Sequence, residues 1–172
     1  MDTEKLLKLL KENNVDFIII GASAFPVYGY ARATLDIDLF VRPVLDNIKK
    51  TIKALTQFGY DLSEITSEDL LKKKVLIRQY MVEADIHPFV KGVTFEDVWK
   101  NKIKAEYGST EVYFPSIEDM IKMKKAAGRA KDKEDLKYLE RIKAKYEVLF
   151  KEYVQNFSHL IFVLFPMITL IF

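Results

Sequence analysis

The sequence contains no cysteine among its 172 residues. Disulfide bonds, thiolate catalysis and cysteine-based zinc sites are therefore excluded. Only two histidines are present, His87 and His159, so a histidine-rich metal site is disfavoured. The formal net charge is only +2, and the total charge therefore predicts no strong affinity for polyanions.

Long hydrophobic runs are also scarce, with one exception at residues 157–172, which read FSHLIFVLFPMITLIF. A membrane-spanning helix needs about 20 apolar residues, and this shorter run is interrupted by Pro166. We therefore expect the segment to dock on an apolar groove, in this chain or in a partner. A membrane anchor is the less favoured alternative.

The composition, with 49% hydrophobic and 30% charged residues, is that of an ordinary soluble globular protein. The first residues, MDTEKLLKLLKENN, have the pattern of an amphipathic helix and not of a signal peptide, so we expect a cytoplasmic location. We predict a single domain over residues 1–157, with a core at about 14–115, C-terminal helices at 116–157 and an apolar tail at 158–172.

Hydrophobic periodicity and turn residues predict helices and strands in mixed order, which indicates an α+β (α/β) fold with a helical C-terminal part. Thr94 and Ser116 are expected to cap helices. Helices are predicted at 2–13, 22–28, 45–58 and 67–73. Three more are predicted: one that begins after Thr94, one from Ser116 to about Ala127, and one from Asp132 to roughly Phe157. Strands are predicted at 16–20, 35–41, 75–80, 82–87, 103–107 and 110–114.

Two aspartates, Asp36 and Asp38, stand in the otherwise apolar run LDIDLFV. Side chains two residues apart on a strand share a face, so both carboxylates point the same way, and Leu35, Ile37 and Leu39 are expected to point into the core. Like charges side by side repel each other, and a divalent cation would reverse that penalty. The alternative is that both aspartates lie on the solvated face of an edge strand.

A third carboxylate would complete a metal site, and Asp85 in VEADIHPF is the best candidate. On that strand Glu83, Asp85 and His87 share one face. Two metal ions about 3.5–4 Å apart can activate an attacking oxygen and stabilise a leaving one. His87 would then tune the site or accept a proton, or would have no chemical role; these alternatives stay open.

The strand DFIII is followed by Gly21, Ala22 and Ser23, which form a strand-turn-helix. A glycine lets the backbone approach a ligand closely, and the N-terminus of the following helix can donate N–H groups to an anion. Phosphate on one side and a carboxylate-bound metal on the other suit a nucleoside triphosphate. The alternative is a plain glycine turn between strand and helix.

The segment GASAFPVYGYARATLDIDLFV resembles the signature of the DNA polymerase beta-type nucleotidyltransferase superfamily. Within the superfamily, the segment more closely resembles the small AbiEii-like branch of abortive-infection and toxin–antitoxin proteins. That branch shows G-G-x-A, then a glycine, then R-x-T-x-D-I-D. The matching positions are Gly21, Ala24, Gly29, Arg32, Thr34, Asp36 and Asp38. Ala22 departs from the pattern, because the superfamily usually has Gly or Ser there.

Two downstream segments extend the resemblance to about residues 16–140. VEADIHPFVKGVTFEDVW is similar to the strand that carries the third acid, which places Asp85. SIEDMIKMKKAAGRAKDKEDLKYLE is similar to the C-terminal signature, in which Lys124, Arg129, Lys131 and Asp132 match. We expect Asp132 to act as a helix N-cap and not as a catalytic acid.

The resemblance implies a mixed β-sheet flanked by helices and a nucleotidyltransferase activity that uses Mg²⁺, with two ions, or Mn²⁺. Asp36, Asp38 and Asp85 are implied as the catalytic and metal-binding residues. The implied nucleotide- and phosphate-binding residues are Gly21, Ala22, Ser23, Arg32, Thr34, Lys124, Arg129 and Lys131.

The nucleoside triphosphate is the implied substrate, and the acceptor hydroxyl belongs to tRNA, a protein or a small molecule. The branch suggests a toxin–antitoxin or defence setting, with tRNA as a first candidate and an antitoxin or other partner protein. Residues 122–145 carry ten Lys and Arg against four Asp and Glu, which favours a phosphate backbone or simply a solvated helix face. The alternative function is a catalytically weak or inactive nucleotide-binding module with the same fold.

Overall fold

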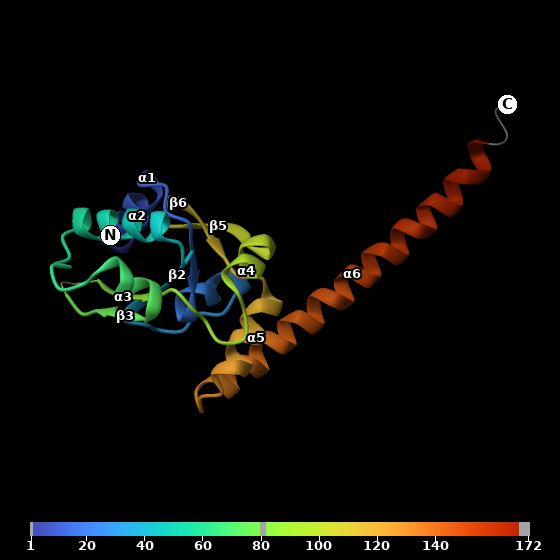
Figure 1. Cartoon of the computed structure of the whole chain (residues 1–172). Coiled ribbons are helices and arrows are strands. Elements are labelled where there is room, and N and C mark those ends of the chain that lie inside the picture. The colour runs from blue at the N-terminus through green and yellow to red at the C-terminus, as the bar shows by residue number, and fades with distance from the viewer. Residues whose placement is uncertain (1, 80–81, 169–172) are drawn as a thin grey trace.

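A four-stranded mixed sheet runs through the body of the molecule (Figure 1). The structure is a computed structural model that describes residues 2–79 and 82–168, with side chains as far as Tyr153. Strand β1 (Phe17–Ile20) runs antiparallel to β2 (Asp36–Val41), and β2 runs parallel to β4 (Glu83–His87). Strand β3 (Val75–Ile77) pairs antiparallel with the far side of β4. The predicted mixed sheet is thereby confirmed.

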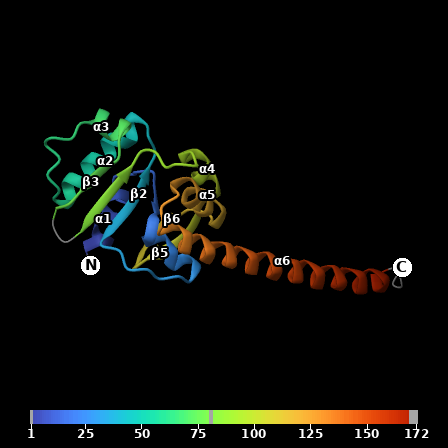
Figure 2. The same cartoon turned by 90° about the horizontal axis from the view of Figure 1, so that it is seen from below.

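Helices cover both faces of this sheet (Figure 2). Alternate residues of β1 show the division, since Ile19 joins the larger core cluster and Ile18 joins a second, smaller one. The larger cluster takes in α1 (Asp2–Glu12), α2 (Leu45–Phe58) and α3 (Ser67–Lys72). The smaller cluster includes residues of α4 (Phe95–Asn101) and α5 (Ile117–Ala127).

Strand β2 divides its side chains between these two clusters. Ile37 and Leu39 are buried in the larger cluster, as expected from the alternation, and Phe40 lies in the smaller one. Leu35 was also expected in the core, but it precedes the strand and is 89% exposed. Asp36 and Asp38 therefore project from the face of β2 that α4 and α5 cover only in part.

Capping residues mark where three helices begin. The Thr66 side chain accepts a hydrogen bond from the Asp69 amide before α3, in a reciprocal capping box. Thr94 and Ser116 accept corresponding bonds before α4 and α5, as predicted. Strand β3 ends at Ile77, earlier than predicted, and the end of the expected strand at residue 80 lies outside the described residues.

A separate two-stranded sheet joins β5 (Ile103–Tyr107) to β6 (Thr110–Phe114) through the predicted turn at Gly108 and Ser109. Glu4 of α1 fixes this turn by accepting hydrogen bonds from the Ser109 amide, at 3.0 Å, and from its hydroxyl, at 2.5 Å. These hydrogen bonds lower the pKa of Glu4 to about 2. The hairpin is thus fastened to the N-terminal helix.

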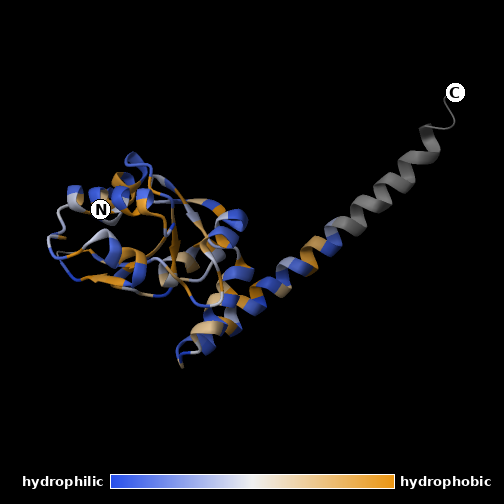
Figure 3. Cartoon of the chain, viewed as in Figure 1, coloured by the Kyte–Doolittle hydropathy of each residue, from blue (hydrophilic) through white to orange (hydrophobic). Residues whose placement is uncertain are grey.

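Helix α6 (Asp132–Ile168) packs against α5 at its start and then projects away from the body (Figure 1). It continues past the predicted end at residue 157, because no glycine or proline interrupts the sequence before Pro166. Figure 3 shows apolar residues on the projecting part, where Phe150 is 68% exposed. Among the described residues, no helix has the length and apolarity needed to cross a membrane.

The apolar tail lies largely beyond the described side chains, and residues 169–172 lie outside the described chain altogether. The predicted docking of this tail, and the division at residues 157 and 158, stay predictions.

Candidate active site

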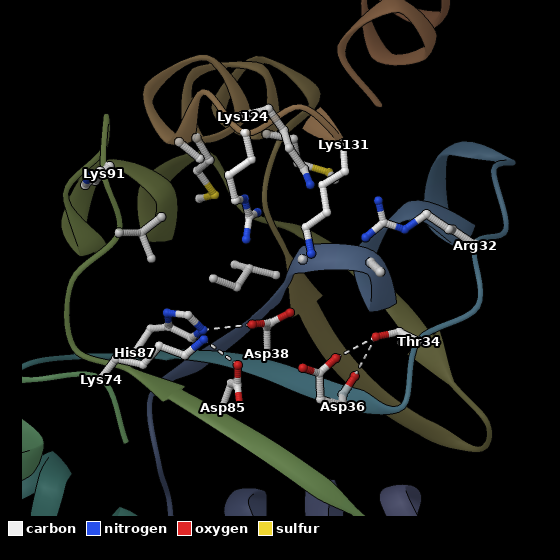
Figure 4. Close-up of a pocket in the computed structure, with 18 of the residues that line it drawn as sticks. Arg32, Thr34, Asp36, Asp38, Lys74, Asp85, His87, Lys91, Lys124 and Lys131 are labelled. Carbon is white, nitrogen blue, oxygen red and sulfur yellow. Dashed lines mark hydrogen bonds and ion pairs between the residues drawn. The ribbon is translucent and has the colours of Figure 1, made fainter. Parts of the chain in front are cut away.

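The sheet register brings two predicted acids into direct apposition. Asp38 of β2 pairs with Asp85 of β4, and Asp36 pairs with Glu83. Because residues in register on neighbouring strands point to the same face, the carboxylates of Asp38 and Asp85 lie side by side. Figure 4 shows both turned toward one cavity, with Asp36 farther along β2.

This cavity has a volume of about 710 Å³, which is within the usual range for small-molecule sites. Ten of the eleven predicted site residues line it, although they come from widely separated parts of the sequence. The ten are Gly21, Ala22, Arg32, Thr34, Asp36, Asp38, Asp85, Lys124, Arg129 and Lys131. Ser23, the eleventh, is not part of the lining.

A glycine is required at position 21 because a side chain there would collide with Asp38. It begins the 3₁₀ helix η1 (Gly21–Tyr28) with φ of +67°, a conformation that favours glycine. A Cβ atom at this position would stand 2.0 Å from the Asp38 carboxylate oxygen Oδ2. The glycine turn therefore lets the backbone of η1 approach the acidic strand, as an anion cradle beside a metal site would require.

Asp85 is buried and surrounded by cations from the β3 edge. Its Oδ2 forms an ion pair with Lys74, and its Oδ1 forms one with Arg78, whose Nη1 lies 2.7 Å away. Burial alone would raise the pKa of Asp85, but hydrogen bonds and charge from Lys74 and Arg78 outweigh it and hold the pKa below its ordinary value. The carboxylate is therefore ionised at neutral pH.

The two aspartates of β2 have different partners. The Thr34 hydroxyl donates to Asp36 Oδ1 at 2.6 Å, and Arg78 lies 3.8 Å from its other oxygen. Asp38 Oδ1 instead lies 2.8 Å from Nε2 of His87. Thr34 therefore has a hydrogen-bonding role in the loop before β2.

One group of metal-ligating side chains is present in the part of the chain that the structure describes. Single ligand atoms from Asp38, Asp85 and His87 all lie within 4.8 Å of one another. Asp36 is outside this group, although it lines the same cavity. Carboxylate oxygens and an imidazole nitrogen are donors that a divalent cation accepts, and such an ion would share Asp85 with Lys74 and Arg78.

A second ionic cluster forms the wall of the cavity opposite the sheet. Nζ of Lys124 lies 3.0 Å from Asp132 and 2.8 Å from Asp135. Arg129 forms an ion pair with Asp132 at 2.8 Å, and Arg32 forms one with Asp135 at 2.9 Å. Three of the predicted phosphate-binding cations are thus held in place by two carboxylates of α6.

Asp132 was expected to cap a helix, but it is the first residue of α6. Its carboxylate turns back to accept hydrogen bonds from the side chains of Lys124 and Arg129 and from the Arg129 amide. The physical reason is burial: at 1% exposure the charge requires cationic partners. Burial would raise its pKa, but these hydrogen bonds and charges prevail and lower it well below its ordinary value.

The charges of the lining suit a polyanion held beside a metal. Six basic residues line the cavity against three acidic ones, and Figure 4 shows Lys124 and Lys131 pointing toward the acidic strands from the opposite side. No sequence pattern predicts a role in the site for the basic residues Lys74 and Lys91, or for the apolar lining by Phe89, Val90, Met120 and Met123. Residue type alone does not distinguish these side chains from surface lysines and core residues.

A mixed sheet with paired aspartates, a glycine turn and a basic opposite wall defines a protein equipped for phosphoryl-group chemistry. A family model described as "Nucleotidyltransferase of unknown function (DUF6036)" matches residues 1–149. The chain belongs to this family, so the superfamily resemblance seen in the sequence is confirmed, whereas the AbiEii-like branch stays a prediction. Comparison with curated proteins gives no match.

Proposed function

We propose that this protein transfers a nucleoside monophosphate from a nucleoside triphosphate to an acceptor hydroxyl, in a reaction that depends on Mg²⁺. The observation that carries the proposal is the cavity itself, in which Asp36, Asp38 and Asp85 face a wall of basic side chains. A triphosphate with its metal ions needs both signs of charge at close range. The family assignment supports the same class of reaction.

The carboxylates of Asp36, Asp38 and Asp85 would hold two divalent ions, which lower the barrier to attack and stabilise the developing charge when bound. Asp38 and Asp85 have the most direct access to a shared ion, because they lie in register on adjacent strands. Mn²⁺ is an alternative to Mg²⁺. The role of Asp36 would be to extend the site toward Thr34 and the loop before β2.

The phosphates would lie between η1 and the wall formed by α5 and α6. The backbone at Gly21 and Ala22 lines the cavity at the start of η1, where N–H groups can meet an anion. Lys131 also lines the cavity and has no ion pair with the described residues, so its charge is available for phosphate. Lys124 and Arg129 are held in place by Asp132 and would supply fixed positive charge.

In the chemical step the acceptor hydroxyl gives up its proton and its oxygen attacks the α-phosphorus in line. The new oxygen–phosphorus bond forms as the bond from the α-phosphorus to the bridging oxygen breaks, and pyrophosphate leaves with that electron pair. Asp85, ionised at neutral pH, would accept the proton or orient the hydroxyl. The basic wall would stabilise the charge that develops on pyrophosphate.

The nucleobase would occupy the apolar part of the cavity. Val90, Met120, Met123 and Ala127 line this part, and Phe89 lines it while 58% exposed. Apolar and aromatic surface suits the flat face of a base. No asparagine, glutamine or serine is among the lining residues described, so we expect side chains to discriminate weakly among the four bases.

We propose tRNA as the first acceptor to test, in a toxin–antitoxin or defence setting with a partner protein. The basic stretch at 122–145 supports this only in part, since Lys122, Lys125 and Lys143 form ion pairs with acidic neighbours. Lys133 and Lys137 are exposed. Binding to tRNA through such residues would weaken with rising salt concentration.

A nucleotide-binding module without transferase activity is the second candidate, and one observation favours it. Lys74 and Arg78 already neutralise Asp85, which a metal ion would have to share. Ala22 also removes the side-chain hydroxyl that the superfamily often presents to phosphate. Such a module would bind a metal–nucleotide complex tightly and transfer nothing.

Calorimetry with Mg²⁺ complexes of ATP, GTP, CTP and UTP, followed by transfer of labelled nucleotide to tRNA and protein pools, tests the two candidates. We expect Asp36→Asn and Asp38→Asn to lower transfer at least about a thousandfold, because metal-ion stabilisation is worth several kcal/mol. Asp46→Asn, at an exposed position on α2, is the matched control. Unchanged transfer in both site variants would contradict the proposal, and tight binding without transfer would favour the module.

A further inference from the structure

We propose that His87 is a metal ligand, which with Asp38 and Asp85 forms a mixed nitrogen and oxygen site that selects Mn²⁺ over Mg²⁺. The inference deepens the proposed function and rests on it, since it concerns the ion nearest the reacting phosphate. Asp38, Asp85 and His87 would bind this ion directly, and Asp36 would not be one of its ligands.

The separation of the ligand atoms fits a single ion. Nε2 of His87 and Oδ1 of Asp38 lie 2.8 Å apart. Two adjacent ligands of an octahedral ion at about 2.1 Å stand about 3 Å apart, so both atoms could bind one ion with little movement. The third ligand atom, from Asp85, lies within 4.8 Å of the other two. Opposite ligands of such an ion are about 4.2 Å apart, and the group therefore needs only a small contraction.

The backbone places these three side chains together without help from any flexible loop. His87 follows Asp85 by two residues on β4, so both project from the same face. Asp38 is the register partner of Asp85 on the neighbouring parallel strand. A site held on strands is more rigid than one held on loops, and it keeps its ligand spacing when empty.

The three candidate ligand side chains are mostly buried, so an ion bound between them would interact strongly with their charges. The side chain of Asp85 is 5% exposed, and those of His87 and Asp38 are 15% and 21% exposed. Oδ1 of Asp85 is fully buried and forms an ion pair with Nη1 of Arg78 at 2.7 Å. An ion bound here would be largely shielded from solvent and would share Asp85 with Arg78.

The charge at the site comes from two carboxylates and from the two cations that flank one of them. Two carboxylates supply two negative charges, and Lys74 and Arg78 flank Asp85 on the side of β3. A third carboxylate in place of His87 would add repulsion that only a metal could offset. An imidazole that binds a metal through a ring nitrogen supplies a donor without adding a negative charge.

The donor set decides which metal is preferred. Mg²⁺ favours oxygen ligands and retains several waters, whereas imidazole nitrogen favours first-row transition ions. Mn²⁺ accepts carboxylate oxygen as readily as Mg²⁺ does and gains more from a nitrogen donor. A site of two carboxylates and one imidazole is therefore expected to bind Mn²⁺ the more tightly of the two.

Another reading of the same 2.8 Å contact is that His87 only orients Asp38 through a hydrogen bond. His87→Gln separates the two roles, because a glutamine amide can donate a hydrogen bond to Asp38 but is a poor metal ligand. His159→Gln applies the same substitution to the second histidine of the sequence and is the matched control.

The experiment uses the full-length protein titrated with Mn²⁺ alone, without nucleotide. Electron paramagnetic resonance measures the free ion, and electron spin-echo envelope modulation detects coupling of bound Mn²⁺ to imidazole nitrogen. We expect nitrogen coupling in the unmodified protein and in His159→Gln, and none in His87→Gln. The affinity for Mn²⁺ should fall at least about tenfold in His87→Gln, while Mg²⁺ affinity, measured by competition, changes by less.

Nitrogen coupling that is absent from the unmodified protein, or that persists in His87→Gln, would overturn the inference. Nucleotide transfer is measured on the same samples. Transfer by a protein without nitrogen coupling would leave the proposed function intact and reject the role of His87. Nitrogen coupling without transfer to any acceptor would keep the metal site and reject the transferase.

Discussion

Two pairs of aspartates differ sharply in their surroundings: Asp36 and Asp38 on the sheet line the cavity, and Asp132 and Asp135 of α6 lie behind its basic wall. The side chains of Asp36 and Asp38 are 31% and 21% exposed. Those of Asp132 and Asp135 are each 1% exposed and are bound by Lys124, with further arginine partners. The first pair is accessible to a ligand, whereas the carboxylates of the second pair are already bound by lysine and arginine side chains of the protein.

The difference shows that the role of a carboxylate depends on the cations that fold against it. On the sheet, the partners of the β2 acids are a hydroxyl, an imidazole and a distant guanidinium. A metal ion can replace such partners at low cost. At α6, the partners are a buried ammonium and arginine side chains, so these acids fix the positions of the cations and are not free to bind a metal.

The largest effect that tests this comparison is expected from Asp132→Asn. Loss of one charge leaves the buried Lys124 ammonium with only Asp135, and breaking a buried pair destabilises a protein by about 3 kcal/mol. Chemical denaturation measures the loss at pH 7. The pKa of Asp132 is lowered in the folded state, so its stabilising contribution is complete above the ordinary carboxyl pKa of about 4. It is lost as pH falls through the lowered pKa, and the variant should lack this acid-dependent component.

Glu134→Gln supplies the control, because Glu134 is an exposed acid in the same helical turn. Its effect on the free energy of unfolding should stay within about 0.5 kcal/mol. Equal losses from the two variants would show that Asp132 acts as a general helix-terminus charge and that the buried network is unimportant.

Gly21→Ala is expected to give the next largest effect, on the sheet side of the comparison. The left-handed backbone costs an alanine about 1 kcal/mol, and the new Cβ would collide with the Asp38 carboxylate. We expect a total loss of about 2 kcal/mol in stability and at least a tenfold loss of metal affinity, measured by denaturation and by Mn²⁺ titration.

Gly29→Ala separates the two causes, since Gly29 has a similar φ of +75° and its nearest atom, the Tyr138 hydroxyl oxygen, would be 4.0 Å from a Cβ. This variant should show the backbone cost with metal affinity unchanged. A similar loss of metal affinity in both variants would mean that Gly21 does not protect the position of Asp38.

The smallest effect is expected from Lys131→Met on the basic wall. Lys131 lines the cavity without an ion pair to the described residues, so its removal should weaken binding of a nucleoside triphosphate by about fivefold, or about 1 kcal/mol. Lys125→Met is the control, because Lys125 is paired with Glu140 outside the cavity lining. Calorimetry that gives equal affinities for the two variants would remove Lys131 from the phosphate site.

Local signals predicted most elements well. The boundaries of α2 and of both strands of the hairpin at Gly108 were predicted to the residue, because each is set by nearby capping, glycine or alternation. The end of α6 and the exposure of Leu35 were predicted wrongly. Leu35 continues the apolar alternation of β2 but lies outside the strand, and α6 continues past residue 157 because no helix-breaking residue stops it there.

The acids of the site were also predictable, since paired carboxylates on an apolar strand stand out in any sequence. Their partners were not, because Arg32 meets Asp135 and Arg78 meets Asp85 only through the tertiary fold. Nothing in the local sequence distinguishes Lys74 from the two lysines that precede it. The basic wall was predicted in outline, but not the carboxylates of α6 that hold it.

The sequence by itself determined which side chains share a face within β2 and within β4, the glycine turn before β2, and the family of the chain. Alternation of side chains and the conformational demands of glycine act within a few residues, so they can be read along the chain. The tertiary structure decided which acids stay open and which are neutralised. It also decided that His87 stands beside Asp38. The state of the acids and the position of His87 both depend on polar groups that meet only when distant segments pack together.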